Sequence, residues 1–215
     1  MSDLSQPQFT LEYLSALSAA GIHPATLVDV LSEFESELHI ETNTRPSAPE
    51  LFSAFFTIYL LSLILEHDLN EARFLLQRIP QTRQKDPQIE TATKLVKALY
   101  TRSYPEIYAT LALPEWSAAA IPLVNRVEQD FKKSTFSLLS KAYTTITPGS
   151  VNLYLGLDTP EEETIKNLVS EGWSYDAERK LLKPSVKYNS GVSRVGQMDD
   201  RIERLTSLVT HLADV

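Results

Sequence analysis

The sequence contains no cysteine, and this absence excludes several kinds of site. Without cysteine there is no disulfide scaffold, no thiolate zinc site and no cysteine nucleophile. Glycine is also scarce, with only six among 215 residues. Few glycines, with prolines at the boundaries of periodic segments, are typical of a helical protein.

Long hydrophobic runs are missing as well. The most apolar stretch extends from Leu51 to Leu65, between Glu50 and Glu66, and it contains serine and threonine. A membrane-spanning helix needs about 20 apolar residues, so we expect this stretch to be a buried core helix. The first seven residues have neither the basic nor the apolar region of a signal peptide, and we expect none here.

The composition predicts a folded protein with a hydrophobic core, since 43% of the residues are hydrophobic and 22% are charged. The formal net charge is −8. An acidic protein of this kind is disfavoured as a nucleic-acid binder, because counterion release rewards a basic face.

Hydrophobic periodicity predicts helices along most of the first 133 residues. Apolar side chains recur at spacings of three and four residues, and prolines or polar stretches separate the periodic segments. The predicted helices cover 9–20, 24–38, 47–67, 87–101 and 114–133, with a loop at 41–47. In the last of these helices the residues expected to face inward are Trp116, Ile121, Val124, Val127 and Phe131.

Two predicted capping boxes in this region share the same residue pattern. Asp68 with Glu71, and Ser103 with Glu106, each place an N-cap acceptor three residues before a carboxylate. The boxes lie 35 residues apart, and each follows an apolar helix. A period of about 34 residues is typical of tetratricopeptide-like helix–turn–helix repeats.

The pattern changes near residue 134 and predicts a winged helix. A short helix is expected at 136–143, and threonine N-caps followed by proline open two more, at Thr147-Pro148 and Thr159-Pro160. Two extended segments then follow within 173–183, about a polar turn. Three short helices and a hairpin, in this order, indicate a winged-helix fold.

The last part of the chain predicts a docking helix behind a linker. Residues 185–197 contain serine, lysine and glycine without periodicity, so we expect a flexible linker. A free helix as short as 198–215 is marginal in water, and each apolar side chain stabilises by about 1.5–3 kcal/mol when it is buried. We expect this helix to dock on partners, or to fold back on its own domain, through a heptad seam. The docking residues are Met198, Ile202, Leu205, Leu208, Val209 and Leu212.

Several short motifs, taken in order and spacing, carry a family resemblance. They are Ala72-Arg73-Phe74-Leu75 with Arg78-Ile79-Pro80, Ser103-Tyr104-Pro105 before Ile107-Tyr108, Phe136-Ser137-Leu138-Leu139 with Ala142-Tyr143-Thr144, Leu155-Gly156-Leu157, Gly172-Trp173, and Arg204-Leu205-Thr206 with His211-Leu212. From about residue 50 onward the chain resembles the eighth and smallest subunit family of the COP-nine signalosome.

This resemblance implies both a fold and a function. The fold is a PCI domain, in which helical repeats are fused to a winged helix. The function is membership of the assembly that removes the ubiquitin-like modifier Nedd8 from cullin-RING ubiquitin ligases. In that family the chemistry belongs to a different, metalloprotease subunit.

No constellation of residues in the sequence supports an enzyme. The four histidines, at 23, 39, 67 and 211, lack the spacing that would place two of them on one zinc ion. Motifs of phosphate-binding loops, dinucleotide-binding turns and serine-hydrolase elbows are absent. The acidic run Glu161-Glu162-Glu163 is expected to interact with the N-terminus of its helix. We therefore predict a non-catalytic protein with no metal ion and no cofactor.

The predicted winged helix offers two ways to bind a partner. Its third helix carries four glutamates and one lysine, a charge of −3 that would repel DNA phosphates. The alternative is a protein partner whose strand pairs with an exposed sheet edge, which the resemblance also implies for PCI winged helices. The residues expected at this edge are Trp173, Tyr175, Leu181 and Leu182.

Together these features predict a mainly α protein with four parts: a helical-repeat domain (1–133), a winged-helix subdomain (134–184), a flexible linker (185–197) and a C-terminal docking helix (198–215). We expect a scaffold subunit of a hetero-oligomer, with other PCI and non-PCI signalosome subunits as partners and with no nucleic acid or membrane. The resemblance implies a nuclear and cytoplasmic location. The alternatives are a small PCI subunit of the proteasome lid or of translation initiation factor three, and a winged-helix DNA-binding protein.

Overall fold

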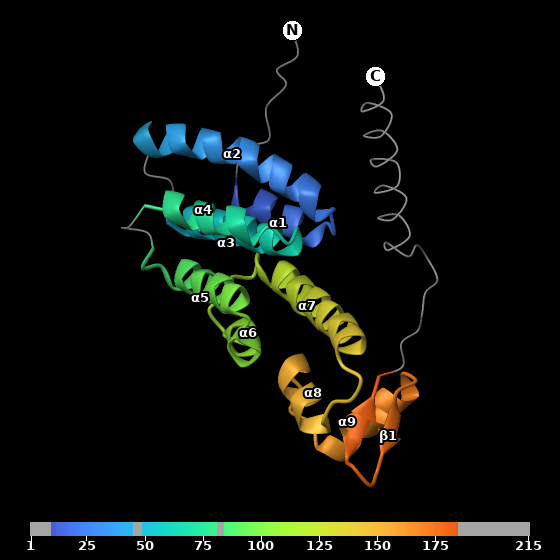
Figure 1. Ribbon diagram of the computed structural model, residues 1–215. Helices are drawn as coiled ribbons and strands as arrows, with labels where there is room; N and C mark the ends of the chain where they lie inside the picture. Colours follow the sequence, from blue (N-terminus) through green and yellow to red (C-terminus); the bar gives the residue numbers. More distant parts are fainter. Residues whose placement is uncertain (1–9, 45–48, 81–83, 185–215) are drawn as a thin grey trace, which may run out of the picture. The chain divides into compact units, whose positions relative to one another are not determined.

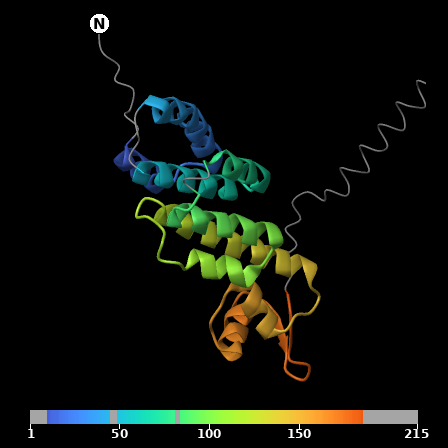
Figure 2. The same cartoon turned by 90° about the vertical axis from the view of Figure 1, so that its left-hand side faces the viewer.

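The structure, a computed structural model, describes residues 10–44, 49–80 and 84–184 of the chain (Figure 1 and Figure 2). Its elements, in chain order, are α1 (Leu11–Ala19), α2 (Pro24–Thr44), α3 (Pro49–Leu65), α4 (Leu69–Arg78), α5 (Pro87–Thr101), α6 (Tyr104–Leu111), α7 (Ile121–Ala142), α8 (Pro148–Leu155), α9 (Glu161–Ser170), β1 (Ser174–Asp176) and β2 (Leu181–Lys183). Helices dominate and the two strands form one small sheet, so the mainly α prediction is confirmed. The predicted linker and docking helix lie outside the described residues.

Helix α3 is the centre of the larger hydrophobic core. Every residue from Phe52 to Leu65 is buried, as the apolar run predicted. A helix that is apolar on all sides needs cover on all sides, and α1, α2, α4, α5 and α7 all pack against it (Figure 1). Within 10–44, 49–80 and 84–184, no helix combines the length and the apolar character needed to cross a membrane.

The three hydroxyl groups buried on α3 have different surroundings. Ser53 Oγ donates a hydrogen bond to the Asp86 carboxylate at 2.6 Å, and Ser62 Oγ donates to the Ile58 carbonyl oxygen at 2.8 Å. The Thr57 hydroxyl has no hydrogen-bond partner among the residues that the structure describes. A buried hydroxyl without a partner costs about 1–3 kcal/mol, so Thr57 weakens the middle of the core helix.

The helix pairs α3–α4 and α5–α6 are joined by matching turns. Each first helix is followed by a non-glycine residue in the left-handed region, His67 with φ 62° and Arg102 with φ 55°. This conformation costs a residue with a β-carbon about 1–2 kcal/mol. The two residues lie 35 positions apart in the sequence, the same spacing as the two capping boxes.

The capping boxes themselves had different outcomes. Asp68 accepts a hydrogen bond from the backbone N–H of Glu71 at 2.9 Å, so this cap is confirmed. Ser103 occupies the N-cap of α6, but its hydroxyl makes no capping hydrogen bond, and this half of the prediction was wrong. Pro105, in the first turn, has no N–H to offer to the hydroxyl.

Helix α7 is continuous where two separate helices were predicted. The break expected near residue 134 was wrong, because α7 extends from Ile121 to Ala142. Residues 132–134 are polar, but the inward stripe continues on the other face of the helix. That stripe consists of Val127, Phe131, Thr135 and Leu139. One helix therefore contributes to both hydrophobic cores, and the predicted boundary between 133 and 134 falls inside it.

The start of α7 also differs from the prediction. Residues 114–120 form turns, and the helix begins at Ile121 instead of Pro114. Ile121 is 47% exposed and does not face inward. Trp116 is buried in these turns, where its ring N–H donates to the Thr110 carbonyl oxygen at 3.2 Å. Trp116 therefore anchors the turns before α7, whereas the sequence predicts that it begins the inward stripe of that helix.

Two further boundaries differ by a few residues. Helix α2 continues to Thr44, through the first residues of the predicted loop at 41–47, because nothing from 41 to 44 is a glycine or a proline. The N-cap of α9 is Pro160, not Thr159. The half-buried Thr159 hydroxyl instead lies 3.0 Å from the hydroxyl of Thr164.

A second, smaller core follows the main one. It joins the end of α7 to α8, α9 and the hairpin through Leu139, Ile146, Val151, Leu155, Leu168, Trp173 and Leu182. As predicted, Thr147 caps α8, accepting from the backbone N–H of Ser150 at 3.3 Å. The elements thus occur in the order expected of a winged helix, and that assignment, like the division into domains, stays a prediction.

Candidate interaction surfaces

The side chains proposed for the sheet edge do not all reach the surface. Trp173 is 3% exposed and Leu182 is 0% exposed, so both belong to the second core. Their apolar groups fill the space between α7, α8 and α9, so a partner would meet the backbone of these two residues and not their side chains. Their role at the edge stays a prediction. Trp173 packs against Phe136 of α7, with ring centroids 5.5 Å apart. Tyr175 and Leu181 are half-buried.

The backbone of β1 nevertheless presents a free edge within the described sheet. Strand β2 pairs with β1 on one side, and on its other side Leu182 exchanges two backbone hydrogen bonds with Ile146, at 2.8 and 2.9 Å. The N–H and C=O of Leu182 point toward Ile146 and therefore away from β1. In the ladder of β1 and β2, Leu182 and Tyr175 are therefore a non-hydrogen-bonded pair. The N–H and C=O of Tyr175 therefore point away from β2, along the outer edge of β1.

The acidic third helix does not favour nucleic acid. Glu161, Glu162 and Glu163 are all exposed in the first turn of α9. Their carboxylates lie near the positive end of the helix dipole, as expected from the sequence. A surface of this charge would repel a phosphate backbone.

Helices α6 and α8 meet around Tyr108. Its hydroxyl donates to the Tyr154 carbonyl oxygen at 3.0 Å, and the Lys132 ammonium lies 5.7 Å from the centre of its ring. Burial raises the pKa of Tyr108, and the Glu128 carboxylate raises it further. This contact attaches the second core to the helical repeats.

Arg78 joins α4 to α2. Its guanidinium donates to both carboxylate oxygens of Glu35, at 2.8 and 3.1 Å, and to Glu71 at 2.9 Å. Burial lowers the pKa of Arg78, but the hydrogen bonds to the two carboxylates outweigh burial and raise it overall. Arg78 therefore links α4 to α2 through the two carboxylate oxygens of Glu35.

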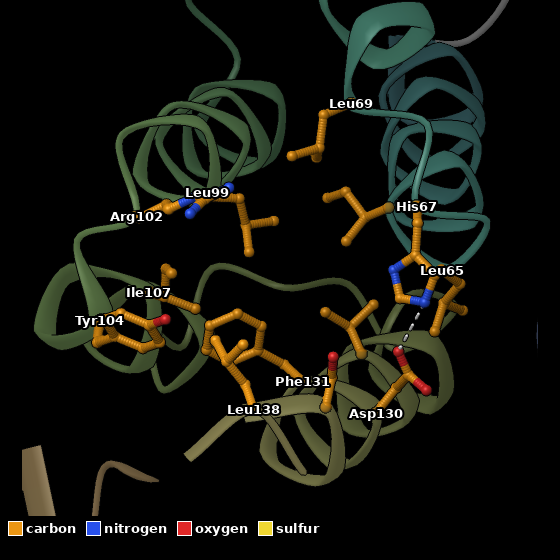
Figure 3. A pocket seen from close by; sticks show the side chains of 13 residues that line it. Leu65, His67, Leu69, Leu99, Arg102, Tyr104, Ile107, Asp130, Phe131 and Leu138 are labelled. Atoms are coloured by element: carbon orange, nitrogen blue, oxygen red, sulfur yellow. Dashed lines mark ion pairs between the residues drawn. The ribbon is translucent and has the colours of Figure 1, made fainter. Parts of the chain in front are cut away.

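A pocket of about 300 Å³ lies where α3, α5, α6 and α7 meet (Figure 3). We call it the repeat pocket and define it by Leu65, Leu69, Leu99, Ile107, Phe131 and Leu138, with His67, Arg102 and Asp130 at its rim. The sequence does not predict this pocket. The signal in the sequence that bears on it is the 35-residue spacing of the two capping boxes, which puts His67 and Arg102 at equivalent turns.

The acidic and histidine side chains of Glu66-His67-Asp68 have other roles or lie apart. Asp68 caps α4, while His67 Nε2 lies 3.6 Å from Asp130 Oδ2 (Figure 3). In the described ranges no three histidine or acidic side chains are grouped so that they could hold a metal ion. The predicted docking residues Met198, Ile202, Leu205, Leu208, Val209 and Leu212 lie outside those ranges.

Comparison with known proteins gives a consistent result. Residues 50–190 match the model of the CSN8/PSMD8/EIF3K family. A protein of Emericella nidulans named COP9 signalosome complex subunit 8 is 33% identical over 180 residues, which cover 83% of this chain and 85% of that protein. Proteins of the same name are 27% identical over 184 residues in Danio rerio (85% and 92% covered) and 32% identical over 159 residues in Arabidopsis thaliana (73% and 78% covered).

Proposed function

The chain belongs to the CSN8/PSMD8/EIF3K family, and on this premise we propose that it is a subunit of a COP9 signalosome. The observation that carries the proposal is the similarity to signalosome subunit 8 over most of both chains, in a fungus, a fish and a plant. The family description also covers proteins of other names, but the relatives named above are signalosome subunits.

The role we propose is that of a non-catalytic scaffold in a deneddylating assembly. The sequence holds no catalytic motif, and polar residues of the described fold such as Asp68 and Arg78 serve in a helix cap and an ion pair between helices. We propose a nuclear and cytoplasmic location, as the resemblance implies.

We propose two docking elements within this role. The first is the outer edge of β1, where the backbone N–H and C=O of Tyr175 are available to a strand of a neighbouring subunit. The second is the heptad seam predicted at 198–215, whose apolar residues call for burial against other helices. Together they would hold the chain by a sheet edge and by a helix bundle.

The test is affinity purification of the tagged chain from its own cells at moderate salt, followed by mass spectrometry. The full chain and a 1–196 truncation are compared. We expect the full chain to recover signalosome subunits in constant ratio and the truncation to lose most of them. Recovery of proteasome-lid or initiation-factor subunits, or of nucleic acid alone, would contradict the proposal.

A further inference from the structure

The repeat pocket is enclosed by side chains from helices far apart in the sequence. Leu69, Leu99, Ile107 and Phe131 point into one shared space (Figure 3). Leu138, at its margin on α7, is 52% exposed. The pocket is therefore an apolar hollow that opens to solvent beside an exposed leucine.

The rim of the repeat pocket carries unequal charges on its two sides. On one side His67 lies 3.6 Å from Asp130, so this carboxylate has a cationic neighbour when the histidine is protonated. On the opposite side is Arg102 (Figure 3). No hydrogen bond or ion pair joins the Arg102 side chain to any other residue in the described part of the chain. An arginine presents planar, bidentate donors that match a carboxylate.

The backbone places Arg102 at the rim at a cost. The residue adopts a left-handed conformation that favours glycine, and His67 adopts the same conformation at the equivalent turn. Strained residues of this kind cluster at binding sites more than elsewhere. His67 and Arg102 both carry basic side chains, and both line this one pocket. The third non-glycine residue with positive φ in the described chain, Lys180, lies in the turn between β1 and β2.

The size of the repeat pocket limits what it holds. Sites for whole small-molecule ligands span about 300–1,000 Å³, so a volume of about 300 Å³ is at the lower end. It suits one or two inserted side chains better than a cofactor. Among the residues that the structure describes, Arg102 is an unpaired cation at the rim, next to an apolar hollow. This arrangement is the complement of an acidic residue beside a bulky apolar residue.

We propose that the repeat pocket binds a short peptide segment of another polypeptide, which inserts an apolar side chain and places a carboxylate on Arg102. Asp130, on the far rim, repels a second carboxylate and so sets the direction of the peptide. This binding is distinct from docking through β1 and through 198–215. It does not depend on which assembly the chain joins.

The test uses the full chain and a defined peptide set. Each nonapeptide has leucine, methionine, phenylalanine or alanine at its centre, with two aspartates or two lysines on one side of it. Fluorescence polarisation measures Kd, and methyl NMR spectra report on Leu99, Ile107 and Val127, which line the pocket.

Four variants identify the contact. Arg102→Glu reverses the charge, Arg102→Gly removes it while suiting the left-handed backbone, and Arg102→Lys keeps it. Arg73→Glu is the matched control, because Arg73 is an exposed arginine on α4 outside the pocket. Arg102 is itself exposed, so all four chains should fold.

We expect the aspartate peptides with a bulky apolar centre to bind and to shift the three methyl signals. Arg102→Glu and Arg102→Gly should weaken binding by about 10- to 100-fold, because each loses a charge-assisted hydrogen-bonded pair. Arg102→Lys should weaken binding less, and Arg73→Glu should leave it unchanged. The proposal is overturned if no peptide binds at about 1 mM, if alanine-centred peptides bind equally well, or if the Arg102 variants bind like the parent.

Discussion

Gly156 lies against the ring of Tyr108, so closely that a β-carbon at residue 156 would overlap three ring atoms. Gly156 ends α8 in the left-handed region, with φ 62°. Tyr108 belongs to α6, and its hydroxyl binds the Tyr154 carbonyl oxygen two residues before the glycine. The attachment of the second core to the repeats therefore depends on the absence of one side chain.

Gly156→Ala should lower the free energy of unfolding by about 2–4 kcal/mol, because overpacking adds to the cost of a left-handed alanine. Urea denaturation measures the change. Gly21→Ala is the matched control, since Gly21 has φ 64° but nothing within 4 Å of an added β-carbon. The control should lose only the conformational part, about 1–2 kcal/mol. Equal losses in the two variants would show that the Tyr108 ring does not matter.

Alkaline solutions should destabilise the chain through Tyr108. Its pKa is raised by burial in the folded state, whereas the pKa of a tyrosine in the unfolded chain is about 10. The folded state then holds a proton that the unfolded state has lost, so stability is complete below about pH 10 and falls as the pH rises further.

Tyr108→Phe should therefore be less stable by about 0.5–1.5 kcal/mol at pH 7, where it lacks the hydrogen bond to residue 154. Above about pH 10 its stability should fall less steeply than that of the parent, so the two curves converge. Denaturation at a series of pH values measures both effects. Tyr100→Phe, at a side chain that is 57% exposed, should leave stability at pH 7 unchanged. Parallel curves for Tyr108→Phe and the parent would contradict the prediction.

Thr57→Val should stabilise the chain by about 1 kcal/mol, because it removes a buried hydroxyl that lacks a partner and keeps the branched shape. Ser53→Ala, one turn earlier on α3, should destabilise it by about 1 kcal/mol, because the Asp86 carboxylate loses a hydrogen bond. Thermal or urea unfolding of the two variants measures the change in the free energy of unfolding. A loss of stability in Thr57→Val would mean that its hydroxyl has a partner in the folded protein.

Tyr175→Pro should remove the chain from its assembly, because proline has no N–H for a strand paired on the outer edge of β1. Tyr175→Ala keeps that N–H and should retain most of the association, although it loses the same ring. Co-purification with the tagged variants measures this, and circular dichroism checks that both fold. If the two variants associate equally well, the β1 edge is not a docking site.

Leu205→Asp combined with Leu212→Asp should abolish assembly and leave the fold of residues 10–184 unchanged. Charged residues in a heptad seam cannot be buried against a neighbouring helix without a large desolvation penalty. Co-purification gives the first result, and thermal unfolding of the isolated variant gives the second. Retention of the double variant in the complex would rule out docking through the seam.

The predictions from the sequence held where one segment carries its own signal. The apolar run of α3, the cap at Asp68 and the hairpin after Gly172 are local patterns, and the structure contains all three. The remaining features have tertiary causes. Only packing shows that Thr135 continues the inward stripe of α7, or that Trp173 is taken up by the second core.

The repeat pocket could not be predicted for the same reason. Its walls come from residues between 64 and 138, and no periodicity within one helix indicates which side chains converge. The turns at His67 and Arg102 could have been matched from their spacing. Their left-handed backbone could not, since neither is the glycine or asparagine that usually marks it.

The position of α7 has a consequence for synthesis of the chain. Helix α3 is apolar on all sides, yet α7, which covers part of it, is completed only at Ala142. At ribosomal speeds of about 5–20 residues per second, the stretch from Leu65 to Ala142 takes roughly 4–15 s to emerge. Throughout that interval the face of α3 that α7 will cover stays exposed on the nascent chain, where it is a binding target for chaperones and a nucleus for aggregation when chaperones are scarce.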